Sequence, residues 1–428
     1  MSNQSYQTPR GTRDILPTEQ MYWQHFRKTA EETLSALGVE RIDIPHIENY
    51  EIFTRGIGDN TDIVSKEMYL LESKGKEDDI HLALRPEGTA GIVRSYIQNG
   101  MSSWPQPVKL YYLGAMFRHD RPQKGRYREF FQLGVEIFGD TTPKSDYLSI
   151  MSAWEILKRL GLKNLIVHAN SIGCPKCRPK YVLKLKKYYK EHLGDLCTDC
   201  NQRYSNNPLR LLDCKVEKCQ TFSMNAPVML DLLCLECKSH FSELLELLDY
   251  FQIRYDLDPK LVRGLDYYTR TVFEIFSSED SHKSGSLGGG GRYDGLVEIL
   301  GGSKTPAVGY SLGIDRIVNL MKEQKINSTP PRGVEVCILQ LGEKAKSCAK
   351  HIYDELSDNS VNVLFIPSND SLHSQLKSAT KTNSKYAIII GQAEAVKNEV
   401  ILRDMRASAQ ETLPVKGLAN EVNRRLKL

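Results

Sequence analysis

The chain has 428 residues, which is too long for one small domain and long enough for two or three. With 26% charged and 40% hydrophobic residues it is globular rather than disordered, and its net charge of +4 excludes a strongly basic nucleic-acid coat. No apolar run reaches the ~20 residues of a membrane helix, and the first residues lack an apolar signal segment, so we expect a cytoplasmic protein without membrane contact.

The first part of the chain is predicted to form one helix followed by several strands. Apolar side chains recur at helical spacing over residues 17–37, and residues 41–47 are strand-like. Strands are predicted at 109–118 and 129–138, on either side of a charged loop at 119–128. Because this loop is longer than the usual connection of about 2–5 residues, we expect it to be functional.

The strand at 129–138 divides cleanly into two faces. One face is apolar, and the other carries two polar side chains on either side of a glycine: Gln132, Gly134 and Glu136. Such a face offers a floor on which a flat ligand can lie and form hydrogen bonds. The alternative is a half-solvated antiparallel strand with its polar residues in water.

Two arginines stand where a predicted element begins or ends. Arg118 closes the strand before the charged loop, a position from which a guanidinium group can grip phosphate or carboxylate. Arg316 lies in the first turn of a predicted helix at 314–321, where a cation opposes the helix dipole unless an anion binds beside it. The alternative is an ion pair with Asp315.

Three further segments combine chemically active residue types. Glu87 and Thr89 follow a turn, where Glu87 suits an ammonium group; alternatively, one of them caps a helix. Residues 263–270 contain two arginines, an acid and two tyrosines before an apolar strand. We interpret the glycine run at 288–291 as a loop that lets the backbone approach a ligand, with a flexible surface loop as the alternative.

The last hundred residues are predicted to form a separate domain. The segment at 322–333 is polar and contains two consecutive prolines, which favours a linker, placed at 326–333. Beyond it, strands and helices alternate, which predicts an α/β domain with a largely parallel sheet over 334–428. The remaining boundaries are a core at 1–170 and 260–325 and an insertion at 171–259.

Eight of the ten cysteines fall within one window of 64 residues. They form four closely spaced pairs: Cys174 and Cys177, Cys197 and Cys200, Cys214 and Cys219, Cys234 and Cys237. In a reducing compartment such pairs favour two tetrahedral four-thiolate zinc sites over disulfides. The simplest arrangement joins the first two pairs in one site and the last two in the other, but a crossed arrangement is also possible.

Several of these segments together resemble histidyl-tRNA synthetase, a class II aminoacyl-tRNA synthetase. Residues 38–53, 117–139 and 307–318 are similar to motifs 1, 2 and 3 of the class. The blocks LVRGLDYYTRTVFE at 261–274 and GGGGRYDGL at 288–296 resemble the two histidine-specific motifs. The resemblance, to the bacterial type of the family, implies an antiparallel-sheet α+β catalytic core and a C-terminal α/β anticodon-binding domain. The cysteine-rich insertion departs from the simplest family pattern, because many members lack these thiols.

The resemblance also implies an activity, substrates and site residues. The activity is histidine activation by ATP, with Mg²⁺, followed by transfer of the histidyl group to tRNA-His by a homodimer. The implied roles are ammonium binding by Glu87, Gly88, Thr89 and Gln132; imidazole binding by Glu136 and Tyr268; pocket lining by Tyr267 and Tyr293; catalysis by Arg118, Arg263 and Arg316, of which Arg118 and Arg316 also bind ATP; and tRNA contact by Arg121 and Gln123.

Two alternatives to this enzyme remain at the sequence level. A synthetase-like regulatory subunit without aminoacylation is expected to lose the arginine block or the C-terminal domain. This chain keeps Arg263 of that block and a complete domain after Pro331. A zinc-ribbon nucleic-acid-binding protein leaves Gln132, Glu136 and Arg316 unexplained. Residues 176–190 carry seven Lys or Arg and no acid, so the insertion is either a tRNA contact or a solvated helix face.

Overall fold

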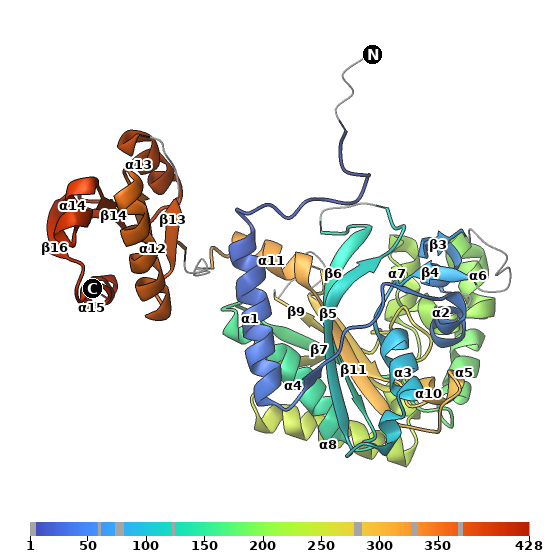
Figure 1. The fold of residues 1–428 in the computed structure, drawn as a ribbon. Helices are drawn as coiled ribbons and strands as arrows, with labels where there is room; N and C mark the ends of the chain where they lie inside the picture. Colours follow the sequence, from blue (N-terminus) through green and yellow to red (C-terminus); the bar gives the residue numbers. More distant parts are fainter. Residues whose placement is uncertain are drawn as a thin grey trace. The chain divides into compact units, whose positions relative to one another are not determined.

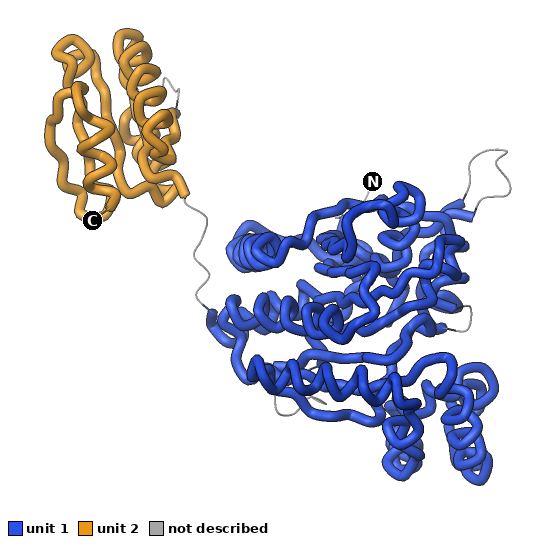
Figure 2. The backbone as a smooth tube through the Cα atoms, turned by 90° about the horizontal axis from the view of Figure 1, so that it is seen from below, with its two compact units in different colours: residues 1–328 blue, residues 329–428 orange. Residues whose placement is uncertain are grey.

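The computed structural model describes residues 6–58, 61–72, 81–121, 125–277, 285–326, 333–366 and 371–427. The chain divides into two compact units, residues 1–328 and 329–428 (Figure 2). This division falls within the expected linker at 326–333, of which residues 327–332 lie outside the described part. None of the described helices is both long and apolar enough to cross a membrane.

An eight-stranded sheet forms the centre of the first unit. Its inner strands pair antiparallel and its two edge strands pair parallel. The order across the sheet is β1 (Glu40–Arg41), β5 (Val108–Phe117), β6 (Glu129–Phe138), β11 (Ala307–Gly313), β10 (Gly288–Arg292), β9 (Thr269–Phe276), β7 (Ile166–Ser171) and β8 (Tyr255–Leu257). The expected antiparallel catalytic core is therefore confirmed.

Helices cover one face of this sheet, as Figure 1 shows. They are α1 (Gln20–Ala36), α4 (Pro143–Arg159), α8 (Leu235–Tyr250) and α11 (Ile314–Glu323). The core beneath them includes Trp23 and Phe26 of α1 and the apolar face of β6, with Leu133, Val135 and Ile137 fully buried. Burial of each such side chain contributes roughly 1.5–3 kcal/mol, which fixes the register of β6 and directs its other face away from these helices.

The opposite face of the sheet lies under smaller elements. They are α2 (Tyr50–Ile57), α3 (Thr89–Gln98), α10 (Leu296–Ile299) and a three-stranded sheet of β2 (Ile47–Asn49), β4 (Leu82–Leu84) and β3 (Leu70–Leu71). The strand expected at 41–47 is thus divided between β1 and β2, with Pro45 in the irregular stretch between them. Phe138 and Tyr112 belong to the core on this side.

The cysteine-rich insertion joins the core on the same side. Its helices α5 (Arg178–Lys190), α6 (Thr198–Asn206) and α7 (Glu217–Met224) lie on this side, whereas its last helix, α8, packs on the other face of the sheet. Tyr181, Leu185 and Tyr189 of α5 are buried in one cluster with the clustered cysteines and with Tyr267 and Tyr268. The insertion therefore packs against the segment that precedes β9.

The second unit has a mixed sheet, not the largely parallel one expected. Its strands are β13 (Val363–Ile366), β12 (Val336–Gln340), β14 (Tyr386–Ile390), β15 (Glu399–Asp404) and β16 (Gln410–Pro414). The first three pair parallel as predicted, but β15 and β16 add an antiparallel hairpin. The helices are α12 (Glu343–Asp358), α13 (Leu372–Lys381), α14 (Gln392–Lys397) and α15 (Leu418–Leu426).

Candidate active site

The polar face of β6 forms the floor of the candidate site. Glu136 lies opposite Gly309 of β11, and a Cβ atom at Gly309 would stand 1.8 Å from Glu136 Oε2. Gly134 lies opposite Tyr112 of β5, and a Cβ there would stand 2.2 Å from the Tyr112 ring. Glycine is required at both positions because the neighbouring side chain fills the space. The half-solvated alternative is wrong for Glu136, which is 1% exposed.

Glu136 is a buried acid of this floor, and its pKa is strongly raised. The Thr89 hydroxyl donates to Glu136 Oε1 over 2.7 Å, and the Tyr293 hydroxyl donates to Oε2. Burial raises the pKa of Glu136 from 4.5 to about 8, and the nearby Glu87 charge works in the same direction. A buried carboxyl that gains or loses its proton near neutral pH is suited to bind a group such as imidazole, which titrates in the same range.

Glu87 and Gly88 lie where α3 begins. Both Glu87 carboxylate oxygens accept backbone N–H groups at this helix start, from Thr89 over 2.7 Å and from Ala90 over 2.8 Å. The helix-cap alternative is thus confirmed for Glu87, whose ammonium role stays a prediction. A Cβ at Gly88 would lie 2.2 Å from the Tyr112 ring, so this glycine makes room for that tyrosine.

Gln132 offers an unsatisfied acceptor on the same face of β6 as Glu136. Its Oε1 is buried and has no hydrogen-bond partner among the described residues. Leaving a buried carbonyl oxygen without a donor costs about 1–3 kcal/mol. A ligand ammonium group, which carries donors and no acceptor, would recover that cost.

Three tyrosines form an aromatic wall over the floor. The rings of Tyr267 and Tyr268 are 4.7 Å apart, and Tyr293 lies 5.5 Å from Tyr267. All three are buried, and burial raises the pKa of Tyr268. The wall therefore presents neutral phenols, which can donate to or accept from a flat polar ring.

Three arginines end at the same site. Arg118 Nε donates to the Pro86 carbonyl over 2.7 Å, and Arg316 Nη1 donates to the Ser286 carbonyl over 2.8 Å. Among the described residues neither guanidinium forms an ion pair, and burial lowers the pKa of both. Arg263 is paired with Glu274 and has a buried, unpartnered Nε. Carbonyls hold Arg118 and Arg316 without neutralising their charge, so these two guanidinium groups are prepared for an anion.

The alternative of an ion pair between Asp315 and Arg316 is wrong. Asp315 instead accepts Arg13 Nη2 over 3.0 Å and the backbone N–H of Phe131 over 2.8 Å. Consecutive residues at a helix start point in different directions, so Asp315 faces the N-terminal segment and Arg316 faces the site. Asp315, the acidic residue of the same helix turn, therefore does not pair with Arg316.

The glycine run at 288–291 is a strand and not the expected loop. It forms β10 between β9 and β11, and a Cβ at Gly290 would stand 2.0 Å from the Gly309 carbonyl oxygen. The glycines therefore permit a close approach between neighbouring strands rather than an approach to a ligand. Arg292 at the end of β10 is fully buried and binds Asp146.

The two tRNA-contact candidates lie in the loop between β5 and β6. Arg121 is exposed, and its backbone N–H donates to the Asp120 carboxylate over 2.6 Å. Gln123 lies outside the described residues. Arg126 also pairs with Asp120, at 3.3 Å.

The cysteines gather in two groups that differ from the simplest predicted arrangement. One group is Cys174, Cys177, Cys234 and Cys237; the other is Cys197, Cys200, Cys214 and Cys219. The sulfurs of each group lie within 4.8 Å of one another. Contacts of 3.6 Å for Cys174–Cys177 and 3.8 Å for Cys177–Cys237 match the about 3.8 Å between thiolates around a tetrahedral Zn²⁺.

The crossed arrangement follows from where the insertion leaves the core. The strands at the two ends of the insertion, β7 and β8, pair side by side, so these two ends lie close together. The cysteine pairs nearest those ends therefore meet, and the two middle pairs form a second group nested inside. Cys177 directly precedes α5, and Cys234 directly precedes α8.

Comparison with known proteins decides the family. A family model described as histidyl-tRNA synthetase matches residues 11–173 and 224–317, and one described as an anticodon binding domain matches residues 335–425. The chain belongs to the histidyl-tRNA synthetase family. The fold and the family resemblance predicted from the sequence are confirmed.

Relatives match over almost the whole chain. A protein named histidine--tRNA ligase from Desulforamulus reducens is 44% identical over 96% of this chain and 97% of its own length. A protein of the same name from Dehalococcoides mccartyi is 42% identical over 98% of this chain and 100% of its own length. The crystal structure of apo histidyl-tRNA synthetase from S. aureus has a TM-score of 0.81 at 31% identity and covers 98% of this chain and 100% of that one.

Within this family site, sequence reasoning missed two buried residues. Tyr112 lies between Gly88 and Gly134, and Arg85 donates to the Ile44 and Ala115 carbonyls at 2.7 and 2.9 Å. The alternation of β5 could have indicated Tyr112, because it lies opposite Gly134 in the polar column of β6. No local signal distinguishes Arg85 from an exposed arginine.

Proposed function

We propose that the protein is a histidine–tRNA ligase that converts L-histidine and ATP to histidyl-adenylate and pyrophosphate. The histidyl group then passes to the 3′-terminal adenosine of tRNA-His, and AMP is released. The observation that carries this proposal is the buried Glu136 at the floor of a site lined by tyrosines and ringed by three arginines. The acid suits an imidazole, and the arginines suit a carboxylate beside a triphosphate.

In the first step a histidine carboxylate oxygen attacks the α-phosphorus, and the bond to pyrophosphate breaks. Arg118 and Arg263 would hold the carboxylate and the α-phosphate, and Arg316 would hold the triphosphate tail. Because these guanidinium groups are already fixed by Pro86, Glu274 and Ser286, they can stabilise developing charge with little reorganisation. Mg²⁺ would accompany ATP and neutralise part of its charge.

Histidine would be distinguished from other amino acids at three points. Glu136 and Tyr268 would bind the imidazole, and Tyr267 and Tyr293 would line its pocket. The ammonium group would meet the unsatisfied Gln132 Oε1 near Thr89 and Glu87. A site whose buried polar groups need a donor rejects analogues that lack one far better than an apolar pocket does.

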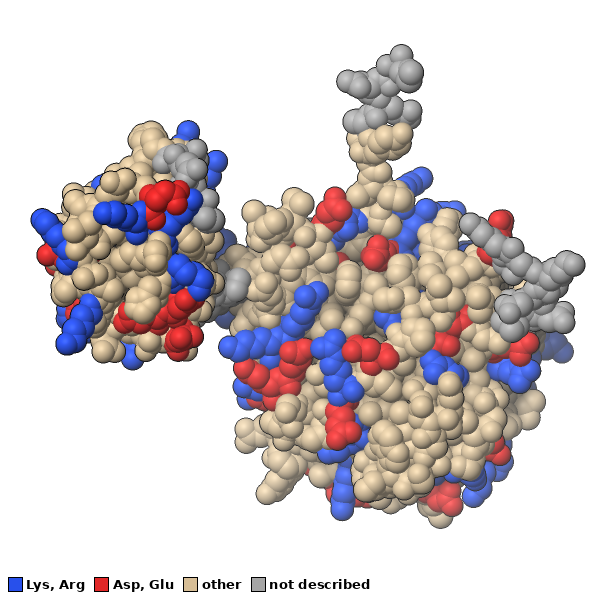
Figure 3. Space-filling model, in the orientation of Figure 1, with Lys and Arg blue, Asp and Glu red and all other residues tan. Residues whose placement is uncertain are grey.

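The cysteine groups would each hold one structural Zn²⁺. All four donors of each group are sulfur, which leaves no open position for substrate and excludes a catalytic role for the metal. The second unit would bind the anticodon region of tRNA-His, as its match to an anticodon binding domain suggests. On the face shown in Figure 3, acidic and basic side chains lie close together on each unit, so tRNA recognition here would rest on local contacts.

We further propose a homodimer acting in the cytoplasm. The three-stranded sheet β2–β4–β3 exposes apolar side chains, with Ile47 at 49% and Leu70 at 62% exposure, together with Leu71 and Leu82. Ile44, within the motif 1 segment at 38–53, is already buried in the core. Light scattering at micromolar concentration should give twice the chain mass, and a monomer would contradict the proposal.

The experiment that tests the activity is ATP–pyrophosphate exchange with each amino acid in turn. We expect exchange with L-histidine and none above background with the others. A regulatory subunit without aminoacylation activity would give no exchange with any amino acid, and this outcome would refute the proposed function.

A further inference from the structure

The residues expected to read histidine lie on an irregular segment that the insertion holds. Residues 261–268, all of them described, form neither helix nor strand, yet they carry Arg263, Tyr267 and Tyr268. Such a segment has few internal hydrogen bonds to fix it, so its position depends on its neighbours.

The insertion contacts this segment at three places. The Arg178 guanidinium donates to the Tyr268 carbonyl and, over 3.4 Å, to the Ile172 carbonyl. Asn207 Nδ2 donates to Asp266 Oδ1, and Arg210 Nη1 lies 3.5 Å from the position of a Cβ on Gly264. Each donor comes from the insertion, and each partner lies within a few residues of a side chain expected to bind histidine.

Asp266 is clamped from the opposite side by the core. Its backbone N–H donates to the Ile57 carbonyl over 3.1 Å, at the end of α2. Gly58 has a φ of +101°, and a Cβ there would stand 2.9 Å from Asp266 Oδ2. Asp266 itself is exposed, but the next residues, Tyr267 and Tyr268, are each only 5% exposed. A shift of Asp266 therefore moves two buried rings.

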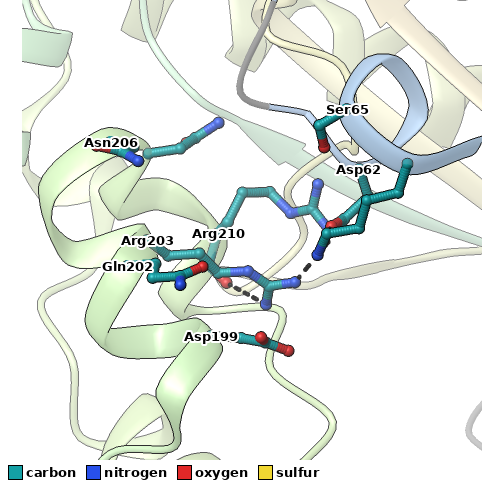
Figure 4. A pocket seen from close by; sticks show the side chains of 9 residues that line it. Asp62, Ser65, Asp199, Gln202, Arg203, Asn206 and Arg210 are labelled. Atoms are coloured by element: carbon teal, nitrogen blue, oxygen red, sulfur yellow. Dashed lines mark hydrogen bonds and ion pairs between the residues drawn. The ribbon is translucent and has the colours of Figure 1, made fainter.

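The insertion is also tied to the core beside this clamp. A polar cleft of about 260 Å³ separates the π-helical turn Ile63–Glu67 from α6. Across it Arg203 reaches Asp62 at 3.5 Å, and Arg210 reaches the same carboxylate at 3.9 Å (Figure 4). These partly exposed pairs contribute little energy each, but they fix the orientation of α6 and the residue that follows it.

We propose that the insertion positions the histidine-binding segment 261–268, and that Asn207 is the positioning residue that acts on it through Asp266. The inference rests on the proposed function. The cysteine groups support both donors, because Arg178 follows Cys177 directly and Asn207 lies between Cys200 and Cys214. Arg263 is held separately by Glu274 of β9, so a displaced Asp266 should disturb histidine binding more than the chemical step.

The test compares full-length Asn207→Ala with Asn206→Ala in histidine-dependent ATP–pyrophosphate exchange. Asn206 ends α6 and lines the same cleft, and it serves as the matched control. We expect Asn207→Ala to raise the Michaelis constant for histidine about three- to tenfold, the effect of one exposed charge-assisted hydrogen bond. In Asn207→Ala, the turnover number and the Michaelis constant for ATP should change less than about twofold, because Arg263 is held separately by Glu274. Asn206→Ala should match the wild type in all three constants.

Variants of Asp266 make the test independent of how well Asn207→Ala folds. Asp266→Asn keeps an oxygen that accepts from Asn207 and should bind histidine almost as well as the wild type, whereas Asp266→Ala should resemble Asn207→Ala. The double variant should be no worse than either single one. Additive effects, equal losses in all kinetic constants, or wild-type behaviour of Asn207→Ala would overturn the inference. Absence of exchange in the wild type would instead overturn the proposed function on which it rests.

Discussion

Replacing Glu136 with glutamine should separate the stability of the site from its function. Burial holds the pKa of Glu136 at about 8, against an ordinary 4.5. The folded state therefore keeps a proton that the unfolded chain releases, and the free energy of unfolding falls as pH rises from about 4.5 to about 8. The difference between the two pKa values corresponds to roughly 5 kcal/mol over that window.

Glu136→Gln removes this titration. In ligand-free protein, the free energy of unfolding of the variant should fall less between pH 5 and pH 8 than that of the wild type, by up to roughly 4 kcal/mol. Urea unfolding at the two pH values measures the difference. The control is Glu155→Gln on α4, on the other face of the sheet from Glu136, measured in the same way.

The same variant should bind histidine poorly. When histidine binds, Glu136 would give up its proton and accept an imidazole N–H as a charged acceptor. Such bonds contribute about 1.5–3 kcal/mol, so the Michaelis constant for histidine should rise about 10- to 100-fold in the variant. The Michaelis constant for ATP should stay within about twofold, because Glu136 faces the tyrosine wall and not the arginines. Equal losses for both substrates would show that Glu136 is structural, and an unaltered pH dependence of stability would refute its buried protonation.

Three further predictions concern the arginines, the second unit and the metal. Arg263→Ala should lower histidine-dependent exchange about 10²–10³-fold with an unchanged unfolding midpoint, and near-normal exchange would remove it from the catalytic residues. Deleting residues 332–428 should leave exchange intact but reduce tRNA charging at least about tenfold, because the candidate site lies wholly in the first unit. Elemental analysis of protein prepared without chelator should find two zinc ions per chain. Replacing Cys174 together with Cys234 should remove one zinc ion, and replacing Cys174 together with Cys197 should remove both. Eight titratable thiols without zinc would refute the two sites.

Local patterns predicted the parts of the fold that local physics determines. The alternation of residue types in β6 predicted its two faces, because successive side chains of one strand point to opposite sides of the sheet, although both faces of this strand are covered over residues 133–138. The helix at 17–37 was predicted for the same kind of reason, and in the structure it spans Gln20–Ala36. The family motifs then supplied the arrangement of the sheet, which no single segment contains.

The errors concern contacts between distant segments. The glycine run at 288–291 has the composition of a loop, but its neighbours β9 and β11 make it a central strand. The cysteine pairing depends on the two ends of the insertion meeting at β7 and β8, which spacing alone does not reveal. Arg85 is buried because the carbonyls of Ile44, Pro45 and Ala115, from two distant stretches of the chain, accept its hydrogen bonds.

Charging of purified tRNA with radiolabelled histidine tests both steps of the proposed activity together. We expect ATP-dependent labelling of tRNA-His by the full-length protein, little labelling of other tRNAs, and strong loss in Arg263→Ala. A protein that folds, binds zinc and forms dimers but transfers no histidine to tRNA-His would refute the proposed function.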